Sequence, residues 1–117
     1  MFEVEKEVSN LELSKKLKEL GFPQEGGGWY WRVDEYRKWL SFYTDSEYKH
    51  KIPDEIFIKA PTCLEILEWI DVAYQKHITS DYLTEKLTYT PEEINPNRLA
   101  EDLIWLIENG YVEFRDV

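Results

Sequence analysis

The segment Glu25–Val33, EGGGWYWRV, constrains the fold more than any other stretch of the chain. Three glycines lead directly into three large aromatic residues. Successive side chains of a β-strand point to opposite faces, so Trp29 and Trp31 would share one face and Tyr30 would take the other. The segment therefore predicts a sheet whose second aromatic face is either covered by the rest of the chain or offered to a partner.

Capping patterns predict the ends of a first helix before the glycine run. Ser9 is expected to be its N-cap, and Glu12 three residues later would complete a capping box. Leucines at helical spacing form the expected buried stripe. Gly21 is expected to end the helix.

Alternating apolar patterns predict the strands. Aromatic and β-branched runs on both sides of Asp34 predict a β-hairpin over residues 29–43, and residues 55–59 predict a third strand. Residues 72–90 favour a second hairpin, because threonine and tyrosine are common in strands; a continued helix is the alternative. Residues 111–114 are a candidate last strand.

Two further helices are expected in the second half of the chain. One begins at Thr62 with a capping box closed by Glu65 and is expected to be short. Its expected buried stripe is Leu64, Leu67 and Ile70, with Ile66 as an alternative further member. The other runs from Asn95 to Gly110. Its expected core face is Leu99, Leu103, Leu106 and Ile107, with Asp102 facing water.

This order of elements predicts an α+β fold in a single domain covering residues 1–117. The sheet is expected to be small, antiparallel and built from hairpins. About three helices are expected to pack on one of its faces.

The chain is strongly acidic, with 24 Asp and Glu against 14 Lys and Arg and a net charge of −10. Such a chain is repelled by nucleic acids and anionic membranes and attracted to basic surfaces. We therefore expect a protein partner with a basic nucleic-acid-binding surface, and no direct contact with nucleic acid or membranes. Acidity that serves solubility alone is the alternative. The sequence has neither a signal-like N-terminus nor a long apolar run, which predicts a soluble, cytoplasmic protein.

The sequence does not contain a pattern that indicates an enzyme, a metal site or a cofactor. Cys63 lies in the first turn of a predicted helix, where a thiol pKa can be lowered, but an adjacent base is missing. His50 and His77 each precede an aspartate by four residues, without cysteine or glutamate at metal-binding spacing. The glycine run precedes a strand, unlike a phosphate-binding loop.

Three segments resemble a family of small hypothetical proteins of tailed phages and prophages. They are LELSKKLKELGFPQEGGGWYW, APTCLEILEWI and LAEDLIWLIENGYV. Residues 72–90 depart from the family, in which a glycine-containing turn is expected where this chain has Thr79–Ser80–Asp81. The family has no assigned activity, so the resemblance implies a genomic setting and transfers no functional residue.

Two features are candidates for contact with a protein partner. If residues 3–7 are extended, their glutamates repeat about every 6.7 Å on one face, close to a phosphodiester repeat; a protective charged edge strand is the alternative. Tyrosines of the hairpin region tolerate exposure and are typical of interface hot spots. The candidate partner-binding residues are Glu3, Glu5, Glu7, Tyr30, Tyr36, Tyr43 and Tyr48.

The leading hypothesis is a phage-type accessory protein that inhibits a host defence or nucleic-acid-handling protein, as an anti-CRISPR protein does, by occluding its basic surface. A second hypothesis is an aromatic sheet pocket that binds a small ligand, such as a nucleotide signal. Its candidate ligand-binding residues are Trp29, Trp31, Arg32, Arg37 and Lys38. A third is a homodimer whose aromatic sheet faces pack together, so a monomer and a homodimer are both compatible with the sequence.

Overall fold

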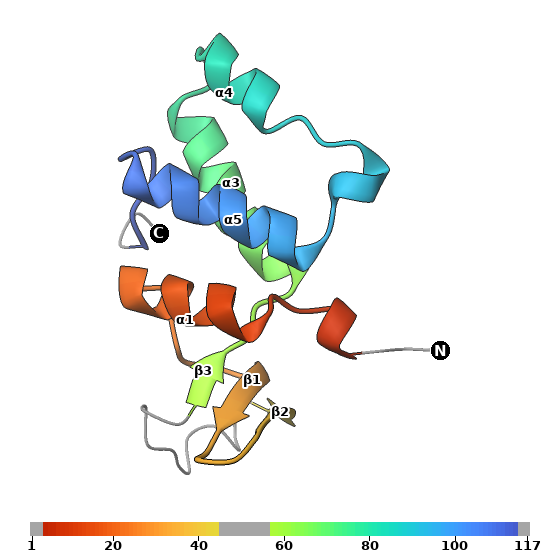
Figure 1. The fold of residues 1–117 in the computed structure, drawn as a ribbon. Helices are drawn as coiled ribbons and strands as arrows, with labels where there is room; N and C mark the ends of the chain where they lie inside the picture. The colour runs from red at the N-terminus through yellow and green to blue at the C-terminus, as the bar shows by residue number, and fades with distance from the viewer. Residues whose placement is uncertain (1–3, 45–56, 115–117) are drawn as a thin grey trace.

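The computed structural model describes residues 4–44 and 57–114 of the 117-residue chain (Figure 1). A three-stranded antiparallel sheet lies on one side of helix α1 (Leu11–Leu20). Helices α3 (Cys63–Lys76) and α5 (Pro96–Glu108) lie on the other side of α1. Three shorter helices complete the described chain: η1 (Val4–Lys6), α4 (Asp81–Lys86) and η2 (Pro91–Glu93). The predicted α+β fold is confirmed.

The sheet has the strand order β2 (Lys38–Tyr43), β1 (Gly28–Val33), β3 (Phe57–Lys59). Strand β1 is central and antiparallel to both neighbours, with Trp31 opposite Leu40 on β2 and Ile58 on β3. The predicted hairpin is therefore confirmed. The predicted third strand is confirmed over Phe57–Lys59, and the first two of its expected residues lie outside the described part of the chain.

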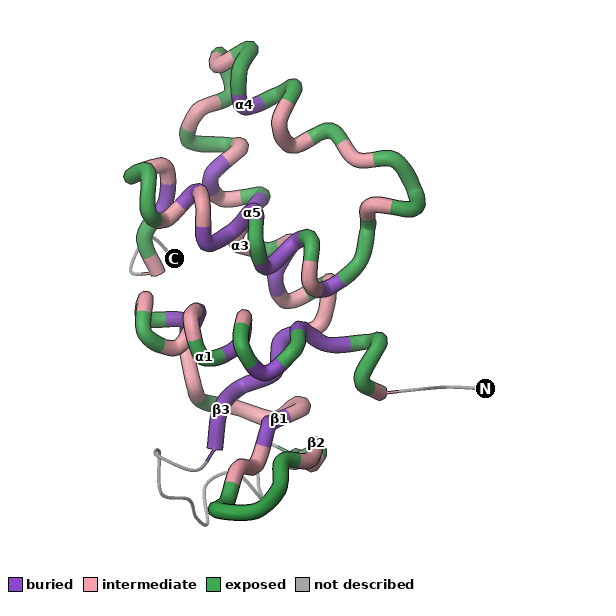
Figure 2. The backbone as a smooth tube through the Cα atoms, in the orientation of Figure 1, coloured by how far each residue is buried: buried purple, intermediate pink, exposed green. Residues whose placement is uncertain are grey.

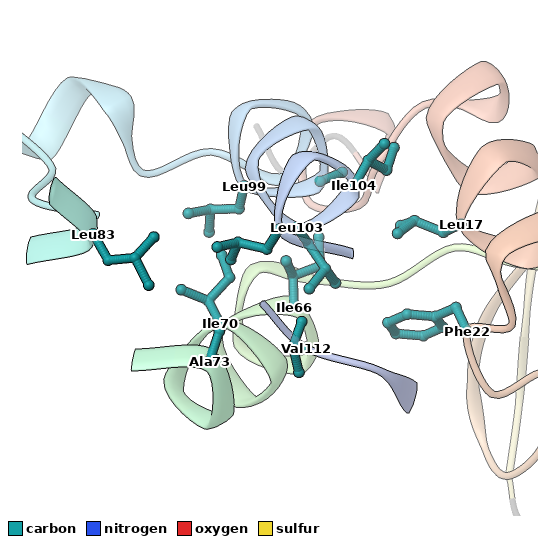
Figure 3. Packing of buried hydrophobic residues seen from close by; sticks show 12 residues of the cluster. Leu17, Phe22, Ile66, Ile70, Ala73, Leu83, Leu99, Leu103, Ile104 and Val112 are labelled. Atoms are coloured by element: carbon teal, nitrogen blue, oxygen red, sulfur yellow. The ribbon is translucent and has the colours of Figure 1, made fainter. Parts of the chain in front are cut away.

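The larger hydrophobic core lies among the helices (Figure 3). Helix α5 packs against both α1 and α3, and apolar side chains from all three helices meet there. Leu17 and Phe22 enter this core from the side of α1, and Leu83 enters it from α4. Figure 2 shows buried positions recurring along α5, as expected for a helix between two layers.

A smaller core covers one face of the sheet. Its buried members are Val8, Leu11, Trp31, Ile58 and Ala60. The indole N–H of Trp31 donates a hydrogen bond to the carbonyl oxygen of Ser9 at 3.0 Å, which fixes the ring. The N-terminal segment and α1 therefore cover the tryptophan face of β1.

The predicted N-cap of the first helix is wrong by one residue. Asn10 is the N-cap, and its side-chain oxygen accepts a hydrogen bond from the Leu13 backbone N–H at 2.8 Å. Ser9 is buried instead, and its hydroxyl lies 2.7 Å from that of Ser14. The predicted helix end at Gly21 is confirmed by its left-handed φ of 105°.

The predicted second hairpin over residues 72–90 is wrong. Helix α3 continues to Lys76, and Ser80 then caps α4 by accepting a hydrogen bond from the Leu83 N–H at 3.2 Å. The alternative of a continued helix is correct as far as Lys76. Ile70 and Ala73, one helical turn apart, are both buried. Burial of this helical stripe outweighs the strand propensity of threonine and tyrosine.

The cap of α3 is confirmed as predicted, but its length and buried stripe differ. Thr62 and Glu65 form the capping box. The helix has 14 residues, so it is not short. Ile70 is buried as predicted, and so is Ile66, the alternative member. Leu64 is 70 % exposed, so its predicted burial is wrong, and Ala73 is buried in addition.

Helix α5 begins at its predicted cap, Asn95, and its last residue is Glu108, with Gly110 at a φ of 79° just beyond the helix. Asp102 is only 7 % exposed, so its predicted outward position is wrong. The predicted strand over 111–114 is also wrong. Val112 is buried there, and Phe114 packs edge-on against Phe22, with 5.2 Å between the ring centroids.

Candidate functional site

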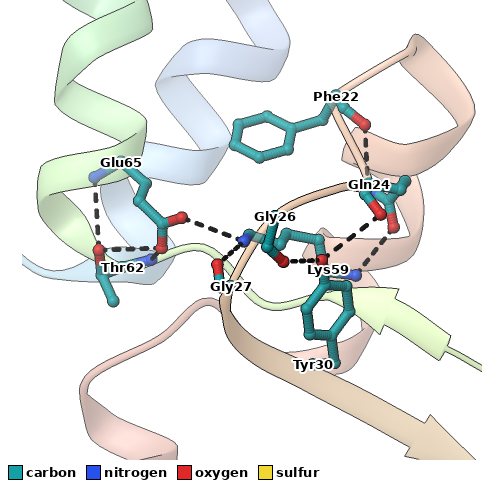
Figure 4. Close-up of polar contacts among 8 residues, drawn as sticks. All are labelled: Phe22, Gln24, Gly26, Gly27, Tyr30, Lys59, Thr62 and Glu65. Carbon is teal, nitrogen blue, oxygen red and sulfur yellow. Dashed lines mark hydrogen bonds and ion pairs between the residues drawn. The ribbon is translucent and has the colours of Figure 1, made fainter. Parts of the chain in front are cut away.

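The glycine run encloses a buried lysine of the chain itself (Figure 4). Lys59 is 4 % exposed, and its ammonium donates a hydrogen bond to the Gly27 carbonyl at 2.5 Å and lies 3.5 Å from a Glu65 carboxylate oxygen. A Cβ on Gly28, whose φ is +129°, would lie 2.9 Å from the Lys59 nitrogen. The glycines therefore hold an internal cation, and their role at this position is structural.

Tyr30 belongs to the same buried arrangement, so its predicted exposure is wrong. It is 1 % exposed, and its hydroxyl donates a hydrogen bond to the Gly26 carbonyl at 2.6 Å. The Lys59 ammonium lies 4.9 Å from the centre of its ring. Because the glycine loop and Lys59 enclose the phenol, Tyr30 is unavailable to a partner.

The acidic ladder predicted at the N-terminus depends on an extended backbone, and that premise is wrong where the structure describes it. Val4–Lys6 forms the 3₁₀ helix η1. The backbone there is not the extended strand on which the predicted alternation of Glu5 and Glu7 along one face depends. Both are exposed, whereas Glu3 lies outside the described residues.

The predicted tyrosine anchors are not gathered into one surface. Tyr36 is 90 % exposed at the hairpin turn. Tyr43 is partly buried, with its ring centroid 5.9 Å from that of Tyr30 and 5.8 Å from that of Phe57. Tyr48 lies outside the described residues.

Three basic side chains of the hairpin lie over aromatic rings. The Arg32 guanidinium lies 5.0 Å from the centre of a Trp39 ring, and that of Arg37 lies 4.5 Å from it. The Lys38 ammonium lies 5.6 Å from a Trp31 ring. Cation–π attraction therefore orders these groups. In the part of the chain that the structure describes, neither Arg32 nor Lys38 forms an ion pair with a carboxylate.

A groove of about 530 Å³ opens beside the hairpin. It is lined by Val4, Glu5, Trp29, Trp31, Lys38, Trp39 and Leu40. The structure thus brings together Trp29, Trp31 and Lys38 of the predicted ligand-binding set, whereas Arg32 and Arg37 do not line the groove. The predicted ligand-binding set did not include Trp39, Leu40 or Glu5. The pairing of the predicted hairpin could have indicated Leu40, because the strand register places it opposite Trp31.

The negative charge is concentrated in the helical region, which we define as residues 61–114. This region contains eleven acidic and three basic residues, a net charge of −8 out of −10. The hairpin, residues 28–43, contains three basic and two acidic residues, a net charge of +1. Helix α1 lies between the two parts (Figure 1). Exposed acids of the helical region include Glu68, Asp71, Asp81, Glu85, Glu92 and Glu101.

One acid of the helical region is buried and neutralised within the chain. The Tyr89 hydroxyl donates a hydrogen bond to Asp102 at 2.8 Å, and the Arg98 side chain lies 3.4 Å from the same oxygen. Burial, and then the bond to Asp102, raise the pKa of Tyr89 well above its ordinary value. Arg98 also pairs with Glu93 at 3.1 Å, which ties η2 to α5.

The described residues show little sign of reactive chemistry. Burial raises the pKa of the Cys63 thiol, and the charge of Glu7 raises it further, so the predicted opportunity for a lowered pKa is not realised. Within residues 4–44 and 57–114, the structure does not gather three His, Cys, Asp or Glu side chains where they could hold a metal ion. Helices in these same ranges lack the length and apolar character that a membrane span requires.

Comparison with models of protein families, with curated proteins and with solved structures finds no match to this chain.

Proposed function

We propose that the chain is a non-enzymatic binding protein whose acidic helical region docks on a basic, nucleic-acid-binding surface of another protein and blocks it. The observation that supports this proposal is the net charge of −8 in residues 61–114 beside a hairpin of net charge +1. An acidity that served only solubility has no need of such a separation, since dispersal depends on net charge. The separation orients an approaching basic surface towards one end of the molecule.

The helical region offers this surface from ordered elements. Glu68 and Asp71 are exposed on α3, and Glu101 is exposed on α5. Helices α3 and α5 pack against each other around the larger core, so these carboxylates are held on a common support. A host defence protein in a bacterial cytoplasm is the setting that the resemblance to phage proteins implies.

Two variants with equal net charge test the proposal. Each carries four neutralising substitutions and changes the net charge from −10 to −6. The helix-neutral variant contains Glu68→Gln, Asp71→Asn, Glu85→Gln and Glu101→Gln. The control variant contains Glu7→Gln, Glu12→Gln, Glu19→Gln and Glu25→Gln, all outside the helical region.

The wild type and both variants are immobilised and exposed to lysate of a bacterial host at low salt. The proposal predicts that the wild type and the control variant retain the same basic protein, whereas the helix-neutral variant loses it. The retained protein should also lose its nucleic-acid binding when the wild type is added. Equal retention by all three proteins would contradict docking through the helical region.

A further inference from the structure

We propose that the groove beside the hairpin is a binding site for a guanine nucleoside monophosphate. The site is independent of the proposed function, because it lies on the hairpin side of α1 rather than in the acidic helical region. Its volume of about 530 Å³ falls within the usual range for small-molecule sites. Three features of its lining favour this ligand.

The first feature is a set of indole rings with fixed positions. The Trp31 N–H is held by the Ser9 carbonyl at 3.0 Å. Trp29 packs edge-on against Phe42, with 5.2 Å between their ring centroids. Trp31 is only 6 % exposed, so the partly exposed rings of Trp29 and Trp39 supply the π surface that a ligand in the groove can reach. Flat heteroaromatic rings such as nucleobases stack on such surfaces.

The second feature is a single cation. Lys38 is exposed, and its ammonium is held 5.6 Å from a Trp31 ring without a carboxylate partner among the described residues. An ammonium beside a stacking surface can bind the phosphate of a stacked nucleotide. Arg32 and Arg37 would favour a longer phosphate chain, but their guanidinium groups lie over the Trp39 ring and do not line the groove. One cation matches a monophosphate rather than a diphosphate or triphosphate.

The third feature is the carboxylate of Glu5, which selects among the bases. A carboxylate only accepts hydrogen bonds, so it favours a base edge that presents donors. The Watson–Crick edge of guanine presents two neighbouring donors, the ring N–H and the exocyclic amine, and a carboxylate can accept from both. The same edge of adenine presents one donor, the exocyclic amine, beside a ring nitrogen that accepts, so a carboxylate can accept only one hydrogen bond there. Glu5 therefore favours guanine, while the net charge of −10 opposes entry of a polynucleotide.

The test is titration of the purified full chain with GMP, AMP, guanosine and the RNA trinucleotide UGU, followed by tryptophan fluorescence. We expect GMP to bind more tightly than AMP and guanosine. Lys38→Gln should lower the affinity for GMP by about tenfold, because it removes one charge-assisted hydrogen bond to the phosphate. The affinity for guanosine, which has no phosphate, should stay nearly unchanged. Glu5→Gln should lower the affinity for GMP by a similar factor and reduce the preference for GMP over AMP.

Lys86→Gln is the matched control. The Lys86 ammonium lies 4.3 Å from a Trp105 ring, so this substitution removes a comparable ammonium–indole pair far from the groove. It should leave GMP binding unchanged. Failure of all four ligands to bind at millimolar concentration would overturn the proposal, as would equal weakening by Lys86→Gln. Tighter binding of UGU than of GMP would overturn the assignment to a free nucleotide.

Discussion

At the scale of single residues, the buried Lys59 ammonium explains why three glycines precede the aromatic strand. Its neighbours are the Gly27 carbonyl and the Glu65 carboxylate, and the Tyr30 ring lies beneath it. The sequence showed the glycines and the lysine about thirty residues apart, and local patterns do not reveal a pairing at that distance. The contact between the glycine run and Lys59 could therefore not be predicted from the sequence.

Gly28 and Lys59 should be energetically coupled. Gly28→Ala places a Cβ 2.9 Å from the Lys59 nitrogen and also strains a backbone with φ of +129°. In the wild type we expect Gly28→Ala to lower the free energy of unfolding by several kcal/mol. In a Lys59→Ala background only the backbone strain remains, so the loss should be about 1–3 kcal/mol. Urea unfolding of the two single variants and the double variant measures the coupling. Additive effects would show that the Cβ does not meet Lys59.

The carboxyl group of Asp34 should titrate at a lower pH than that of an ordinary aspartate. Its carboxylate accepts hydrogen bonds from the backbone N–H groups of Tyr36 and Arg37 at 2.8 and 2.9 Å. The bond to Tyr36, followed by that to Arg37, lowers the pKa of Asp34 below its ordinary value of 3.8. Its folded pKa is below the unfolded one, so its contribution to hairpin stability is present above pH 3.8 and is lost as the pH falls through the folded pKa.

The titration of Asp34 can be followed through the amide NMR signals of Tyr36 and Arg37. We expect both signals to shift together with a midpoint below pH 3.8, and to lose that transition in Asp34→Asn. A midpoint at or above 3.8 would show that the turn hydrogen bonds do not stabilise the carboxylate.

At the scale of elements, caps were more predictable from sequence than strands were. Thr62 with Glu65, Asn95 and Gly21 act as predicted, because each cap depends on residues within one helical turn. The prediction of Ser9 as N-cap was wrong because its hydroxyl pairs with the Ser14 hydroxyl in the folded chain instead of capping the helix. Residues 72–90 were assigned wrongly because burial of the stripe through Ile70 and Ala73 depends on α5.

Asn10, rather than Ser9, should therefore behave as the N-cap of α1. Asn10→Ala removes the acceptor for the Leu13 N–H and should lower the free energy of unfolding by about 1 kcal/mol. Asn10→Asp keeps an acceptor at the cap and should cost much less. A chemical denaturation series on the two variants measures both values. Equal losses would mean that the cap hydrogen bond does not contribute.

Helix α1 connects the two cores, because Leu11 belongs to the sheet core and Leu17 to the helical core. Leu17 is fully buried, and Leu17→Ala should lower the free energy of unfolding by about 2–5 kcal/mol. Leu64→Ala is the matched control: Leu64 is 70 % exposed, so its loss should stay within about 0.5 kcal/mol. Thermal unfolding followed by circular dichroism compares them. A large loss of stability in Leu64→Ala would show that Leu64 is buried, as the sequence predicted, and would contradict the structure.

At the scale of the whole molecule, the distribution of charge matters more than its total. The net charge of −10 was evident from composition, and so was the expectation of a basic partner. That expectation centred on the N-terminal glutamates, because the sequence showed them in a compact alternating run. The fold shows that η1 interrupts that run, and a count along the sequence places most of the excess acid in residues 61–114. Charges spread along 54 residues become one region only once the helices pack.

The affinity for the retained basic protein, measured by calorimetry at several salt concentrations, tests docking through the helical region most directly. For the wild type and the control variant we predict a steep decrease in affinity as salt increases, because screening weakens attraction between charged surfaces. For the helix-neutral variant, with Glu68, Asp71, Glu85 and Glu101 neutralised, we predict weaker binding at low salt and a distinctly shallower dependence. The same affinity and the same salt dependence in all three proteins would contradict docking through residues 61–114.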